Sequence, residues 1–183
     1  MDIFNGEKTI CAVRNRRELE KALSSKPKNI FLLAGNILEM PLFSSMAKEH
    51  GKRLFIHVDM IDGLGKDNAA VDFIHRLGFF GIISTRGNII KHAKSLGMCT
   101  VQRFFIVDGQ SVKTALETIH QTKPSYAELM PGLIYKAITE FSAEQTPIIA
   151  GGLINKKEEL LAAINSGAVA VSTSEDSLWE LEI

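Results

Sequence analysis

The chain has 183 residues, of which 45% are hydrophobic and 23% are charged, so its composition is that of a folded globular protein and excludes general disorder. This length is typical of one domain, which we expect to span residues 1–183. The 21 basic and 21 acidic residues balance, so net charge gives no indication of nucleic-acid or membrane binding.

The other compositional features predict a cytoplasmic protein. No apolar run approaches the ~20 residues of a membrane span. The opening stretch MDIFNGEK is too polar for a signal peptide. Cys11 and Cys99 lie in apolar runs, which favours buried free thiols in a reducing compartment over a disulfide framework or a zinc site.

Eight apolar runs of strand length alternate with amphipathic helical stretches along the chain. Near-continuous apolar strands separated by helices predict a parallel sheet that is covered on both faces. Eight such units can close into a barrel. We therefore predict an α/β fold, a compact (β/α)8 TIM barrel with short loops, and a doubly wound open sheet is the alternative. The predicted strands are residues 9–13, 30–34, 53–59, 80–84, 100–106, 126–130, 147–151 and 168–173.

Functional side chains of such a barrel stand at the C-terminal ends of its strands and in the loops that follow. Alternation along residues 53–59 places His57 and Asp59 on the inward face, and leaves the wholly apolar face for the helices. In the fifth strand, Gln102 and Arg103 must point in opposite directions, and the sequence leaves open which one points inward. The predicted ligand-binding residues are Asn36, His57, Asp59, Asp62, Ser84, Thr85, Gln102, Arg103, Glu128, Gly151, Gly152, Ser172 and Thr173.

The last two strands carry the clearest signal. Gly151 and Gly152 follow the seventh strand, and Ser172 and Thr173 end the eighth. Exposed backbone N–H groups and a helix N-terminus form an anion site, and barrels often bind phosphate in these two loops. The sequence therefore predicts a phosphate site here, although glycines also serve plain tight turns.

His57, Asp59 and Asp62 could be metal ligands, acid–base catalysts or hydrogen-bonding groups for a polar ligand. The stretch HVDMIDG resembles the His-x-Asp strand of the ribulose-phosphate 3-epimerases, which hold a metal with two His and two Asp. The strands ending IISTRGN and IIAGGL lack the other two ligands, so we predict neither a metal nor another cofactor. An Asp-Gly turn also suffices to explain Asp62. Proton transfer between Asp59 and Glu128 stays open as an alternative.

Six motifs together resemble one family. In chain order they are LLAGNILEM, HVDMIDGLGKD, GIISTRGNIIKHAKSLG, TVQRFFIVD, AELMPGLIYKAI and PIIAGGLINKKEE, and they cover nearly the whole chain. The family is that of the glycerol-3-phosphate-responsive antiterminators. The resemblance implies a non-enzymatic regulator that senses glycerol 3-phosphate and binds the leader mRNA of glycerol-utilisation genes to suppress a terminator hairpin.

RNA binding is predicted by this resemblance alone, because the basic clusters are modest and typical of solvated helix faces. Our prediction for the RNA-binding residues is Arg14, Arg16 and Arg17, which follow the first strand. A homodimer that doubles such a patch stays open. The alternative function is a phosphosugar epimerase or isomerase that uses Asp59 and Glu128.

Overall fold

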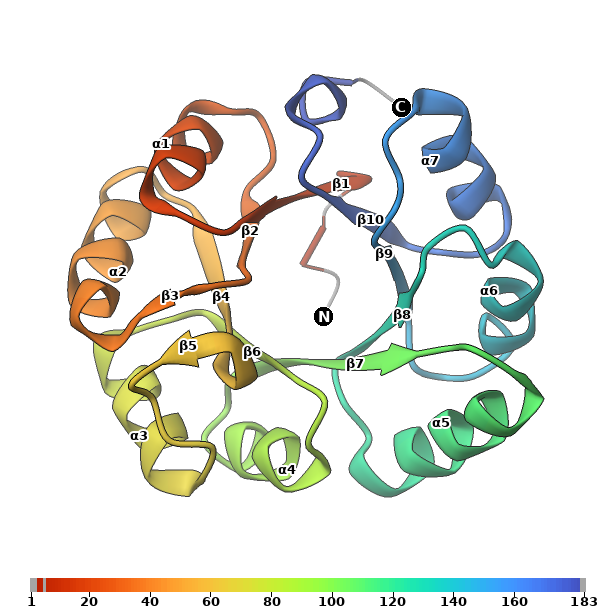
Figure 1. Cartoon of the computed structure of the whole chain (residues 1–183), viewed down its shortest axis with the longest axis horizontal. Coiled ribbons are helices and arrows are strands. Elements are labelled where there is room, and N and C mark those ends of the chain that lie inside the picture. Colours follow the sequence, from red (N-terminus) through yellow and green to blue (C-terminus); the bar gives the residue numbers. More distant parts are fainter. Residues whose placement is uncertain (1–2, 5, 182–183) are drawn as a thin grey trace.

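The computed structural model describes residues 3–4 and 6–181, and its centre is a closed barrel of parallel strands (Figure 1). Each strand pairs in parallel with its neighbours, and β10 closes the ring against β1. The predicted TIM barrel is therefore confirmed. The barrel strands are β1 (Thr9–Val13), β2 (Asn29–Leu32), β4 (Arg53–His57), β6 (Gly81–Ser84), β7 (Cys99–Phe105), β8 (Tyr126–Met130), β9 (Ile148–Gly151) and β10 (Ala170–Thr173).

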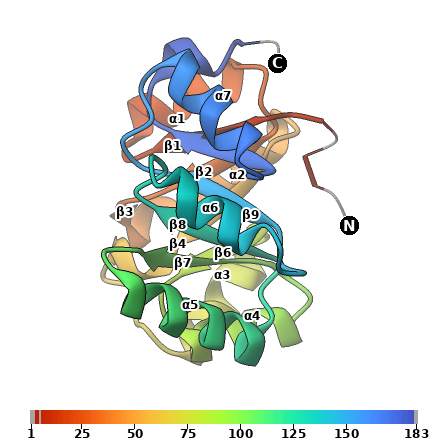
Figure 2. The same cartoon turned by 90° about the vertical axis from the view of Figure 1, so that its right-hand side faces the viewer.

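Helices surround the barrel on all sides in the two views (Figures 1 and 2). After β10, a single 3-10 turn, η3 (Asp176–Leu178), stands where the eighth helix of a full barrel would lie. Among the described residues, none of the helices has the length and apolar character to cross a bilayer. The helices are α1 (Arg16–Ser24), α2 (Met40–Glu49), α3 (Asn68–Leu77), α4 (Gly87–Ser95), α5 (Gly109–Thr122), α6 (Tyr135–Phe141) and α7 (Lys157–Asn165).

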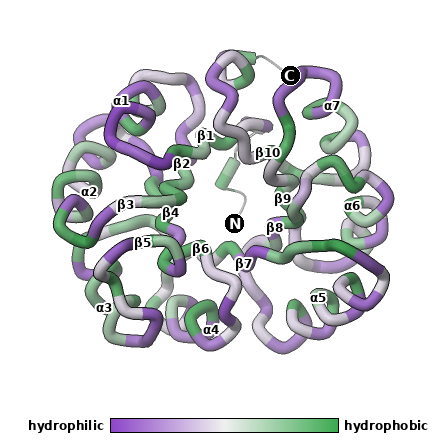
Figure 3. Tube along the Cα trace, in the orientation of Figure 1, coloured by the Kyte–Doolittle hydropathy of each residue, from purple (hydrophilic) through white to green (hydrophobic). Residues whose placement is uncertain are grey.

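Alternate strand residues fill the barrel interior, as the period of two requires. Phe31 of β2 and Phe55 of β4 pack edge to face inside, with ring centroids 5.1 Å apart. The adjacent residues of the same strands, such as Ile30 of β2 and Ile56 of β4, point outward and pack against the helices. The inner ring of strands is accordingly hydrophobic in Figure 3.

The N-terminal segment closes the barrel at the N-terminal ends of its strands and lies over the centre of the ring in Figure 1. Ile3 and Phe4 are buried there. The Ile3 N–H donates to Tyr126 Oη at 3.3 Å, and the Phe4 and Tyr126 rings meet edge to face at 5.1 Å. The N-terminal segment therefore packs against this end of the barrel, whereas the predicted ligand-binding residues stand at the opposite, C-terminal end of the strands.

The third barrel strand is shorter than the predicted 53–59. β4 ends at His57, and Val58–Met60 forms the 3-10 turn η2. The chain leaves the barrel here to build a small second sheet, in which β5 (Ile61–Asp62) pairs with β3 (Gly35–Asn36). Asp59 thus stands on a turn at the barrel mouth and not on the strand itself.

Candidate functional site

A buried chain of hydrogen bonds crosses the C-terminal mouth of the barrel. Arg103 Nε of β7 donates to Glu128 Oε2 of β8 at 2.7 Å, and Ser172 Oγ of β10 donates to Glu128 Oε1 at 2.6 Å. Glu128 is fully buried, and Arg103 is nearly so. Both carboxylate oxygens of Glu128 are therefore occupied, one by a partner from the adjacent strand β7 and the other by a partner from β10, two strands away.

Gly151 of β9 lies beneath the hydrogen bond between Glu128 and Ser172, where there is no room for a side chain. A Cβ at this position would clash with Glu128 Oε1 and lie 2.8 Å from Ser172 Oγ. We expect Gly151→Ala to lower the free energy of unfolding by about 1–3 kcal/mol, because the buried carboxylate must shift away from its partners. Urea denaturation measures this loss. Gly109→Ala is the matched control, since a Cβ there meets nothing within 4 Å; equal stabilities of the two variants would contradict the prediction.

His57 is buried beside this chain as a neutral imidazole. The pKa of His57 is lowered to about 4, chiefly by burial and next by the positive charge of Arg103, while the negative charges of Asp59 and Glu128 partly oppose this shift. Among the described residues, His57 Nδ1 has no hydrogen-bond partner, and it lies 3.8 Å from Asp59 Oδ2. A buried nitrogen without a partner is costly, so this atom is suited to a ligand's hydrogen bond.

Asp59 is held by the loop that follows β6. Its Oδ2 accepts hydrogen bonds from Ser84 Oγ at 3.0 Å, from the Thr85 N–H at 2.8 Å and from Thr85 Oγ1 at 3.2 Å. Its Oδ1 lies 3.3 Å from Arg86 Nε but accepts no hydrogen bond within the described part of the chain. Ser84 and Thr85 therefore orient one oxygen of Asp59 and leave the other available.

A small cavity of about 70 Å³ opens between the loops that follow β9 and β10. The two loops are joined by Thr173 Oγ1, which donates to the Ile154 carbonyl at 2.7 Å. Two guanidinium-bearing residues, Arg14 after β1 and Arg103 of β7, belong to its wall. Apart from Ala12, Leu33 and Met130, the wall consists of Arg14, Arg103, Gly152, Leu153, Ile154, Asn155, Ser172, Thr173 and Ser174. This composition and position suit a phosphate group.

Of the predicted ligand residues, Arg103, Gly152, Ser172 and Thr173 line this cavity. Three others belong neither to the cavity nor to the hydrogen-bonded groups around Glu128, His57 and Asp59. Asn36 is exposed, and its side chain accepts from the Leu38 N–H at 3.0 Å, so it caps the turn η1 (Ile37–Glu39). Asp62 is exposed on β5 beside Asn36. Gln102 faces the helices, where its Oε1 accepts from Thr122 Oγ1 of α5 at 2.6 Å. Of the two alternatives that the sequence left open in this strand, Arg103 points inward and Gln102 points away from the barrel interior.

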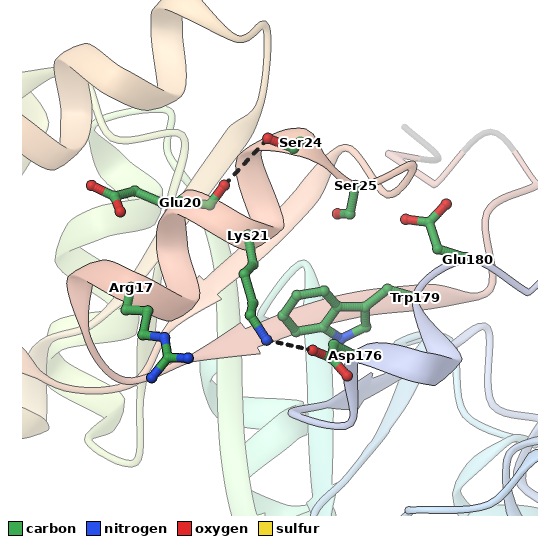
Figure 4. Close-up of a pocket in the computed structure, with 8 residues that line it drawn as sticks. All are labelled: Arg17, Glu20, Lys21, Ser24, Ser25, Asp176, Trp179 and Glu180. Carbon is green, nitrogen blue, oxygen red and sulfur yellow. Dashed lines mark hydrogen bonds and ion pairs between the residues drawn. The ribbon is translucent and has the colours of Figure 1, made fainter.

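The predicted RNA-binding arginines are divided between different surroundings. Arg14 lines the cavity at the mouth, a role that its position after β1 could have indicated. Arg16 forms an ion pair with Glu20 at 2.9 Å. Arg17 lines a surface cleft of about 620 Å³ between α1 and the C-terminal turn (Figure 4). Three carboxylates and one further base share this cleft, namely Glu20, Asp176, Glu180 and Lys21.

The arrangement of possible metal ligands and the state of the two cysteines bear on two other kinds of site. Within the described ranges, His, Cys, Asp and Glu form no group of three or more that could hold a metal ion. Both cysteines are free, and burial raises the pKa of Cys11 to about 12 and that of Cys99 to about 11. Both therefore remain protonated thiols at neutral pH, which disfavours them as nucleophiles.

Residues 9–179 match the family model of the glycerol-3-phosphate responsive antiterminator. The chain belongs to this family. Its fold agrees with that of the glycerol uptake operon antiterminator regulatory protein of Listeria monocytogenes, at 33% identity and a TM-score of 0.92, over 98% of this chain and 97% of that one.

Other relatives extend this result. The glycerol uptake operon antiterminator-related protein of Thermotoga maritima is 28% identical, with a TM-score of 0.87 over 98% of this chain and all of that one. The uncharacterized protein YgcP of Escherichia coli is 33% identical over 174 residues, 94% of this chain and 91% of its own. Deoxyribose phosphate aldolase from Aeropyrum pernix, at 11% identity and a TM-score of 0.72, shares only the barrel fold.

Proposed function

We propose that this antiterminator-family protein senses glycerol 3-phosphate in the cytoplasm and binds the leader mRNA of glycerol-utilisation genes, without catalytic turnover. The observation that carries the proposal is the cavity between the β9 and β10 loops, with Arg14 and Arg103 in its wall. Arginine binds phosphate strongly because its planar donors match the phosphate oxygens and its charge persists at every physiological pH.

The glycerol part of the ligand would extend from the cavity toward β4. Arg103 links the two regions, since it lines the cavity and its charge acts on His57. His57 Nδ1 and Asp59 Oδ1 are the buried polar atoms at this end without hydrogen-bond partners among the described residues. Hydroxyl groups both donate and accept, so two hydroxyls can satisfy both atoms. Selectivity over inorganic phosphate would come from these contacts.

We propose that the protein has no catalytic turnover because the hydrogen bonds of Glu128 leave it poorly placed to transfer a proton. A general acid or base must exchange a proton with the substrate. Glu128 instead accepts from Arg103 and Ser172 with its two oxygens, and Asp59 accepts three hydrogen bonds from Ser84 and Thr85. This arrangement favours fixed ligand contacts over the epimerase or isomerase alternative.

Calorimetric titration with glycerol 3-phosphate, glycerol and inorganic phosphate in parallel tests the sensor site. We expect glycerol 3-phosphate to bind most tightly, and Arg14→Ala to weaken it about 10- to 100-fold, because a charged hydrogen bond to the phosphate is lost.

Arg16→Ala is the matched control for Arg14→Ala. Arg16 is a neighbouring arginine whose side chain pairs with Glu20 and does not line the cavity. The proposed site would be contradicted by equal affinities for inorganic phosphate and glycerol 3-phosphate, or by equal losses of affinity for glycerol 3-phosphate in the two variants.

A further inference from the structure

The end of the barrel opposite the ligand cavity carries a basic arc. Here the helices end and the strands begin, so the α-to-β loops of successive units lie next to one another. The arc is formed by the loops between α1 and β2, α2 and β4, α3 and β6, α4 and β7, and α5 and β8. Its basic residues are Lys26, Lys28, Lys48, Lys52, Arg53, Arg76, Lys94 and Lys123.

Hydrogen bonds show that neighbouring parts of the basic arc touch. Lys52 Nζ donates to the Pro27 carbonyl at 2.9 Å, and the Arg53 N–H donates to the Lys28 carbonyl at 2.7 Å. On the other side, Lys94 Nζ donates to the Lys123 carbonyl at 2.7 Å. The basic side chains thus gather over adjacent loops.

The basic residues of the basic arc outnumber the acidic residues that lie beside them. Within the described ranges, Lys28, Lys48, Arg76 and Lys123 are exposed and form no ion pair. Four acidic residues adjoin the arc. Glu7 accepts from the Lys28 N–H at 2.9 Å, Glu180 accepts from the Lys26 N–H at 3.2 Å, Glu144 lines a cavity together with Lys123, and Glu49 follows Lys48. Basic residues in the last turn stabilise a helix end, which explains those on α2, α3 and α4. It does not explain Lys28 of the α1–β2 loop, whereas Lys52 of the α2–β4 loop joins the two loops through its hydrogen bond to the Pro27 carbonyl.

A cavity of about 810 Å³ with an aromatic wall lies beside the basic residues of the arc, and the loops between α3 and β6, α4 and β7, and α5 and β8 contribute to its wall. Its wall includes Phe80, which is 37% exposed, and His75. The Arg53 guanidinium lies over the Phe80 ring at 5.3 Å from its centroid. An exposed ring beside a guanidinium is a surface on which a nucleic-acid base can stack.

We propose that the basic arc and its aromatic cavity bind single-stranded RNA, which rests on the proposed function as an RNA-binding regulator. The lysines neutralise backbone phosphates, and an unpaired base enters the cavity beside Phe80 and Arg53. RNA and glycerol 3-phosphate then occupy opposite ends of the barrel. The surface around α1 is less suited to RNA, because Arg16 is paired with Glu20 and Arg17 shares its cleft with three carboxylates.

The test uses RNA selected from a random single-stranded pool for retention by the wild-type protein in the presence of glycerol 3-phosphate. We expect Lys28→Glu/Lys123→Glu to weaken retention of this RNA at least about tenfold, with a shallower dependence on salt concentration. Phe80→Leu, which keeps an apolar side chain but removes the ring, should weaken retention about tenfold at unchanged salt dependence. Thermal unfolding by circular dichroism verifies that each variant is folded.

Arg16→Glu/Arg17→Glu on α1 is the matched control and should retain the RNA as the wild type does. Full retention by the basic-arc variants, or loss confined to the α1 variant, overturns the proposed surface while RNA binding itself stands. Failure of the wild type to enrich any RNA removes the RNA half of the proposed function and this inference with it. Binding of phosphatidylserine vesicles without RNA binding would assign the basic arc to a membrane surface instead.

Discussion

Arg103→Met is expected to lower the free energy of unfolding by about 3–5 kcal/mol, because it leaves the carboxylate of Glu128 buried with Ser172 as its remaining partner. Glu128 is fully buried and cannot turn to solvent without opening the barrel mouth. Urea denaturation at neutral pH measures the loss.

The double variant Arg103→Met/Glu128→Gln tests whether the loss of stability in Arg103→Met comes from the unpaired charge of Glu128. A neutral amide in place of the carboxylate needs no counter-charge and can still accept from Ser172, so we expect most of the lost stability to return. Arg16→Met is the control for an exposed pair, since Arg16 and Glu20 are both about half exposed, and it should change stability by about 0.5 kcal/mol or less. A similar small change for Arg103→Met would show that the buried pair has no special role.

His57 should make stability depend on pH below its ordinary pKa. In the folded protein the pKa of His57 is lowered from 6.5 to about 4, chiefly by burial. Between these values the unfolded chain binds a proton that the folded chain does not, so stability falls as the pH decreases from 6.5 to about 4. The full difference amounts to about 3 kcal/mol at 1.36 kcal/mol per pKa unit.

His57→Gln provides the comparison, because glutamine keeps hydrogen-bonding capacity and does not titrate. We expect the unfolding free energies of the wild type and the variant to converge or cross as the pH falls from about 7 to about 4, with the wild type losing about 3 kcal/mol more. The other four histidines and all carboxylates are present in both proteins and largely cancel in the difference. Parallel pH profiles would show that His57 is not buried in its neutral form.

Much of the fold could be read from local sequence. Strands β1 and β8 begin and end where the apolar runs predict, because buried parallel strands need continuous apolar residues. The small sheet of β3 and β5 could not be predicted, since two-residue strands have no periodicity. The position of Asp59 on a turn was not predicted either, because the three-residue turn η2 is also too short to show a periodic pattern. Within residues 174–181, the part of the chain described after β10, the eighth unit has only a short turn, and the apolar side chains of Leu178 and Trp179 are buried there.

Local sequence patterns were enough to predict the barrel, the positions of the loops after the seventh and eighth strands, and the polar residues at the strand ends. Which of these polar residues contact one another depends on the way in which distant strands pack. Glu128 bonds to Arg103, 25 residues before it, and to Ser172, 44 residues after it, because closure of the barrel brings β7, β8 and β10 together at the mouth. Likewise, the direction of each side chain at a strand end depends on the register of the strand. Gln102 therefore points toward α5, and Arg14 lines the cavity.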